Sequence, residues 1–64
     1  MVEAGNWITL NTDNWNDVNK EYFVHAVQYS DNNSSVILDL RDSNGKNFTT
    51  VIASHQILKV KNSP

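Results

Sequence analysis

The dipeptide Asn44-Gly45, with the runs of residues on either side of it, constrains the fold of this chain most. The flanking segments 35–41 and 46–53 are rich in Val, Ile, Leu, Phe and Thr. Such residues favour β-strands, and Asn-Gly supplies the positive φ angles of a tight hairpin turn. The sequence therefore predicts a β-hairpin over residues 35–53.

The register of this hairpin decides which side chains face the core. If Asn44 and Gly45 alone form the turn, Ser43 pairs with Lys46 and the remaining pairs follow. One face then carries the apolar set that we expect in the core: Val36, Leu38, Leu40, Val51 and Ala53. The opposite face carries Ile37, Asp39, Arg41, Phe48, Thr50 and Ile52. A three-residue turn with a bulge is the alternative, and a one-residue slip would mix the two sets.

The rest of the chain predicts three more strands. Residues 6–12 hold a first strand, and 11–20 form a polar loop whose Trp15 and Val18 fold back on the core. Residues 21–29 form a long strand with apolar side chains on both faces, which is typical of a strand that bends to serve two sheets. A turn over 30–34 leads into the hairpin. The break at 54–56 fits a 3₁₀ turn, and a closing strand follows over 57–61.

Length and charge limit the class of protein. The 64 residues form one domain, 1–64, with an ordered core over about 6–61, and no cysteine reinforces it. The formal net charge of −2 does not favour a polyanionic or membrane-surface partner. No apolar run reaches the roughly 18 residues of a membrane span. No signal peptide is recognised at the N-terminus, so we expect a cytoplasmic protein.

This order of elements resembles the small barrels shared by SH3, Tudor and KOW modules. The resemblance covers residues 6–61 and implies an all-β, five-stranded SH3-like barrel with one 3₁₀ turn before the last strand. The chain lacks the Ala-Leu-Tyr-Asp-Tyr run and paired tryptophans of peptide-binding SH3 domains, and it lacks the glycine-centred KOW pattern. The resemblance therefore implies an architecture and transfers no functional residue. An OB-like barrel is the alternative fold, although it normally needs a longer chain.

Catalytic and metal-binding patterns are not found in the sequence. His25 and His55 could bind a metal or transfer protons together with Asp39, but no ligand spacing joins them. The serines fall in predicted turns, where their hydroxyls have local backbone partners. We expect no enzymatic activity, no cofactor and no metal.

A binding role is the function that the sequence favours. Ile37, Phe48 and Ile52 would leave an apolar hairpin face, with Arg41 beside them and Tyr29 or Trp15 joining them. Such a face predicts a protein partner or self-association, as in small accessory factors of phages and plasmids. The competing interpretation is that the loop with Trp15 covers this face. The alternative function is binding of single-stranded nucleic acid, with Tyr22, Phe23, Tyr29 and Phe48 stacking and Arg41, Lys46, Lys59 and Lys61 meeting phosphates.

Overall fold

The fold is all-β, as the sequence predicts. The computed structural model describes residues 2–11 and 20–62, so the predicted placement of Trp15 and Val18 lies outside the described residues. The elements are β1 (Trp7–Leu10), β2 (Glu21–Tyr29), β3 (Ser35–Arg41), β4 (Asn47–Ala53), the 3₁₀ turn η1 (Ser54–Gln56) and β5 (Ile57–Lys61). The described segments contain no helix long and apolar enough to cross a membrane.

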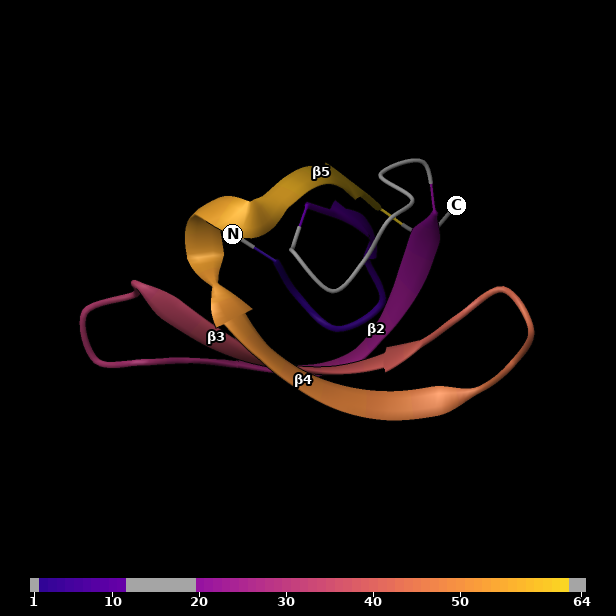
Figure 1. Cartoon of the computed structure of the whole chain (residues 1–64), viewed down its shortest axis with the longest axis horizontal. Coiled ribbons are helices and arrows are strands. Elements are labelled where there is room, and N and C mark those ends of the chain that lie inside the picture. Colours follow the sequence, from indigo (N-terminus) through magenta and orange to yellow (C-terminus); the bar gives the residue numbers. More distant parts are fainter. Residues whose placement is uncertain (1, 12–19, 63–64) are drawn as a thin grey trace.

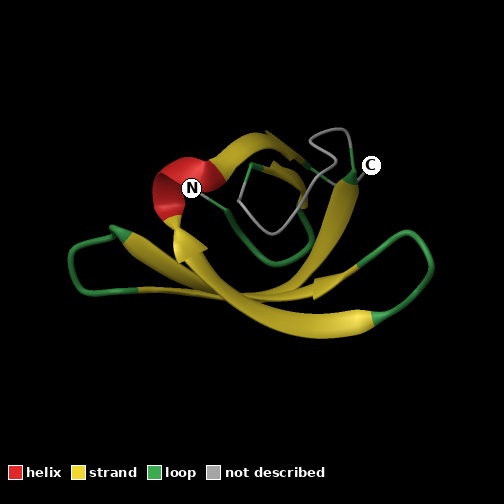
Figure 2. Ribbon diagram, in the orientation of Figure 1, coloured by secondary structure: helices red, strands yellow, loops and turns green. Residues whose placement is uncertain are grey.

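All five strands belong to one antiparallel sheet in the order β4-β3-β2-β1-β5. The sheet curls so that β1 and β5 lie across from β3 and β4, and η1 carries the chain from one half to the other (Figures 1 and 2). β4 and β5 are the two ends of the strand order, and they are not paired with each other. The result is a barrel-like sheet that stays open along one seam.

A bulge at His25 lets β2 serve both halves of the sheet. Val24 pairs with Leu40, whereas Ala26 pairs with Asp39, so His25 is the extra residue on β2. A bulge of this kind shifts the alternation by one position and bends the strand. Tyr22 and Val24 therefore point inward before it, and Val27 and Tyr29 pack against the core after it. This explains why neither face of 21–29 is cleanly polar.

The β3–β4 hairpin exists, but its predicted register is wrong by one residue. Leu40 pairs with Phe48 and Val36 pairs with Ile52, which leaves a three-residue turn over 43–45. The Asp42 carboxylate fixes this turn by accepting hydrogen bonds from the backbone N–H groups of Asn44 and Lys46, each at 2.9 Å. Gly45 takes a φ of 82°, which a residue with a side chain rarely adopts.

The corrected register exchanges the faces of β4. Val51 is 65% exposed and Ala53 is half-buried, so neither belongs to the buried core where the sequence placed them. Ile52 is buried and Phe48 packs against the core. The assignments of Val36, Leu38 and Leu40 to the core are confirmed, because each is fully buried.

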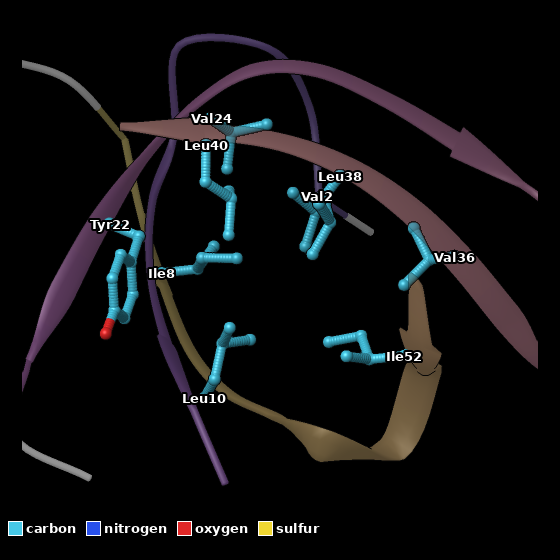
Figure 3. Packing of buried hydrophobic residues seen from close by; sticks show 9 residues of the cluster. All are labelled: Val2, Ile8, Leu10, Tyr22, Val24, Val36, Leu38, Leu40 and Ile52. Atoms are coloured by element: carbon cyan, nitrogen blue, oxygen red, sulfur yellow. The ribbon is translucent and has the colours of Figure 1, made fainter. Parts of the chain in front are cut away.

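The core fills the concave side of the curled sheet. Figure 3 shows the buried apolar side chains pointing toward one another from β1, β2, β3 and β4 and from the N-terminal segment. The cluster consists of Val2, Ile8, Leu10, Tyr22, Val24, Val36, Leu38, Leu40 and Ile52. Residues that alternate with these along the strands project from the opposite side, which we call the outer face.

Candidate functional site on the outer face

One line of paired residues crosses the outer face from edge to edge. Lys61 pairs with Trp7, Trp7 with Phe23, Phe23 with Arg41, and Arg41 with Asn47. These five residues come from all five strands, and we call them the transverse row. Ile8, Val24 and Leu40, which neighbour row members along the strands, are buried. Strand alternation therefore sends the row side chains outward.

Aromatic rings form the centre of the transverse row. The rings of Trp7 and Phe23 lie 5.3 Å apart with an interplanar angle of 65°. The ring centroids of Phe23 and His25 lie 5.1 Å apart with an interplanar angle of 77°. Both contacts are edge-to-face, the arrangement that aromatic quadrupoles prefer. The three rings form one cluster that stays partly open to solvent.

Cations stand at both ends of this aromatic cluster. The Arg41 guanidinium lies 5.0 Å from the centroid of the Phe23 ring, within cation–π range. At the other end, Lys61 Nζ lies 2.8 Å from a carboxylate oxygen of Glu21. Both partners of this ion pair are largely exposed, so it stabilises the fold by about 1 kcal/mol at most. Lys61 can therefore exchange Glu21 for another acceptor at low cost.

A polar hollow lies beside the row on the hairpin side. His25, Asp39, Asn47 and Thr49 line it, together with Leu40 and Phe48. The Thr49 hydroxyl donates a hydrogen bond of 2.6 Å to the Asp39 carboxylate. Beyond Asp39 the outer face becomes apolar again, because Ile37 pairs with Val51 and the two are 43% and 65% exposed.

The outer face thus holds two of the residues that the sequence singled out for binding. Arg41 and Ile37 project from it as expected. Ile52 and Phe48 do not, since the one-residue shift turns them toward the core. Tyr29 also packs against the core, and its hydroxyl accepts a hydrogen bond of 3.1 Å from the Val2 backbone N–H. Trp15 lies outside the described residues.

Trp7 and Asn47 are the two row residues that our sequence analysis did not single out. The alternation of Trp7-Ile8-Thr9-Leu10 was a usable signal, because an inward Ile8 and Leu10 require an outward Trp7. Phe23 was named for nucleic-acid stacking only. Its pairing with Trp7 and Arg41 depends on the strand order, which local patterns do not specify.

No constellation typical of a metal site occurs within residues 2–11 and 20–62. No group of three or more His, Asp or Glu side chains comes together there. His25 and Asp39 line the same hollow, but His55 lies on η1 and is not among the residues that line it. The outer face presents aromatic, cationic and apolar side chains.

Comparison with known proteins finds no matching family model, no similar curated protein and no similar solved structure.

Proposed function

We propose that this chain is a small, non-enzymatic binding module with SH3-like architecture, and that it binds a protein partner through its outer face. The strand order, the long bent β2 and the 3₁₀ turn before β5 support the SH3-like assignment. The partner class is argued from the side chains of the outer face, because small barrels of one architecture serve many functions.

The transverse row is the observation that carries the proposal. Trp and Arg are among the residues most enriched in the energetic centres of protein interfaces, and aromatic residues are enriched in interfaces generally. Here Trp7, Phe23 and Arg41 are neighbours in the middle of the sheet. The exposed pair Ile37 and Val51 extends the apolar surface along the hairpin. A partner would bury this surface while polar groups such as Asn47 and Lys61 form its rim.

The charges of the outer face favour a partner segment that carries carboxylates. Three cations, Arg41, Lys59 and Lys61, stand on β3 and β5 against two carboxylates, Glu21, which is ion-paired with Lys61, and Asp39, which accepts a hydrogen bond from Thr49. A carboxylate can take both donors of a guanidinium fork, which fixes its geometry. We therefore expect the partner to present an acidic residue next to an aromatic or aliphatic anchor.

A displayed peptide library provides the direct test. A random peptide library is selected against the intact protein, and single peptides are then measured by isothermal titration calorimetry. We expect enrichment of peptides that combine acidic and apolar residues. Arg41→Gln and Trp7→Thr should each weaken peptide binding at least tenfold, because truncating a residue at the energetic centre of an interface usually costs that much affinity.

The matched control is Leu58→Ser, which removes an exposed leucine of β5 outside the transverse row. It should leave peptide affinity unchanged. The proposal would be contradicted if selected peptides bound Arg41→Gln and Trp7→Thr as tightly as the original protein, with circular dichroism showing both variants folded.

Single-stranded nucleic acid is the second candidate, because cations flank the aromatic pair Trp7 and Phe23 at both ends. Two features weaken it. The net charge is −2, and the guanidinium of Arg41 already lies over the Phe23 ring that a base would use. Binding through Arg41, Lys59 and Lys61 would give a log–log salt slope of only about −2.

Fluorescence anisotropy with labelled oligo-dT and oligo-U separates the two candidates. For nucleic-acid binding, Glu21→Gln should increase affinity by freeing Lys61, and added salt should decrease it. If no oligonucleotide binds at low salt and the peptide library is enriched, nucleic-acid binding is excluded and the protein partner is retained.

A further inference from the structure

Among the described strands, β4 is a sheet edge that pairs with β3 on one side only. The Ser54 N–H donates to the Ser34 carbonyl, and the Asp42 N–H donates to the Lys46 carbonyl, both at 2.9 Å. Because hydrogen-bonded pairs alternate along an antiparallel ladder, Phe48, Thr50 and Ile52 direct their backbone groups toward β3. The backbone groups of the residues between them point away from the sheet.

The 3₁₀ turn limits how far this free edge extends. The Ala53 N–H points outward and donates to the Gln56 side-chain oxygen at 3.0 Å, so it is already satisfied. Within residues 2–11 and 20–62, the backbone groups of Asn47, Thr49 and Val51 are left without a backbone partner. They repeat at every second residue along one side of β4, as a strand-addition site requires.

β4 also lacks the features that usually protect an edge. Its sequence, Asn-Phe-Thr-Thr-Val-Ile-Ala, contains no charge and no proline, and its register with β3 runs without a bulge. β5, the other edge, carries Lys59 and Lys61. The two edges of one sheet are therefore unequal, and Val51 on β4 is the most exposed large apolar residue of the described chain.

We infer that β4 pairs antiparallel with β4 of a second copy of this chain, with Thr49 opposite Thr49 of the other copy. This register places Asn47 opposite Val51 of the other copy at each end. The outward backbone groups of all three residues in each copy therefore find a partner. Each of the three residue pairs exchanges two hydrogen bonds, which gives about six new bonds.

The side chains of β4 fit a second copy on both faces of the extended sheet. Threonine opposite threonine is a favourable cross-strand pair, and no charged residue of β4 meets its own image. On the concave side, Phe48 of each copy would lie opposite Thr50 of the other and lose its remaining exposure. A two-fold contact of this kind is isologous and closes at a dimer.

This inference is independent of the proposed partner. It would join the outer faces of two copies into one surface with a transverse row in each half. If the peptide selection fails, the dimer can still form, and if the dimer fails, the outer face can still bind.

Sedimentation velocity from micromolar to millimolar concentration tests the inference. We expect a monomer–dimer equilibrium in the original protein. Val51→Lys should raise the dimer dissociation constant by more than tenfold, because a lysine on an edge strand disfavours pairing with another strand. Val60→Lys makes the same change on β5, where the original valine is 46% exposed, and should leave the dimer unchanged.

Hydrogen exchange followed by NMR gives a second measurement that needs no variant. The amides of Thr49 and Val51 should become protected as concentration rises, whereas those of Thr50 and Ile52 should be protected at every concentration. A monomer at millimolar concentration would overturn the inference. So would assemblies larger than a dimer that Val60→Lys abolishes, since they would join β4 to β5.

Discussion

The Arg41 guanidinium lies 5.0 Å from the centre of the Phe23 ring, and the two residues are paired across β3 and β2. Trp7 approaches the same ring from the neighbouring strand at 5.3 Å. The aliphatic stem of Arg41 can cover apolar surface while its charged end stays hydrated. This contact joins the aromatic centre of the outer face to a cation that a partner can use.

The contact between Arg41 and Phe23 should contribute only modestly to stability. An exposed cation–π pair contributes about 0.5–1 kcal/mol. A double-mutant cycle with Arg41→Gln and Phe23→Leu, measured by urea unfolding, should therefore give a coupling energy of that size. A coupling near zero would show that the two side chains do not stabilise each other in solution.

The register of the hairpin predicts a large loss of stability at one residue and a small loss at its neighbour. Ile52→Ala should lower the free energy of unfolding by about 2–4 kcal/mol, because Ile52 is buried. Val51→Ala should lower it by about 0.5 kcal/mol, because Val51 is exposed. Thermal and urea unfolding measure both. The reverse order of the two effects would support the two-residue turn and contradict this register.

Two turn residues with positive φ should respond differently to substitution. Gly45 has a φ of 82°, so Gly45→Ala should lower the free energy of unfolding by about 1 kcal/mol. Asn33 has a φ of 61°, and Asn33→Gly should change stability by no more than about 0.5 kcal/mol because glycine accepts that φ without strain. Urea unfolding checks both, and an Ala variant as stable as the original would contradict the turn geometry.

Tyr29 should act in folding and leave partner binding unaffected. Tyr29→Phe keeps the ring that packs on the core but removes the oxygen that accepts the Val2 N–H. We expect a loss of about 1 kcal/mol in the free energy of unfolding. Affinity for selected peptides should not change. A tenfold loss of peptide affinity in a folded Tyr29→Phe variant would place Tyr29 in the binding site.

Local sequence patterns were sufficient to locate the strands but insufficient for their pairing. The bounds of β2 follow from its run of aromatic and β-branched residues, and η1 follows from the break at 54–56. The hairpin register failed because Asp42 accepts two backbone hydrogen bonds and thereby lengthens the turn by one residue. A side chain next to the turn overrode the preference of Asn-Gly for a two-residue loop.

The candidate site was harder to predict for the same reason. Its members come from all five strands, and their adjacency depends on strand order and on the bulge at His25. A register error of one residue exchanges the two faces of a strand. It therefore moved Phe48 and Ile52 into the predicted site and left Val51 out.

The most direct test of the proposed function is to map the bound surface by NMR. The protein is titrated with the tightest selected peptide, and backbone amide shifts are followed. We predict that the largest changes cluster at Trp7, Phe23 and Arg41, with the Trp7 indole N–H among them. Changes centred instead on η1 or on the 30–34 turn, with the transverse row unaffected, would contradict the outer face as the binding surface.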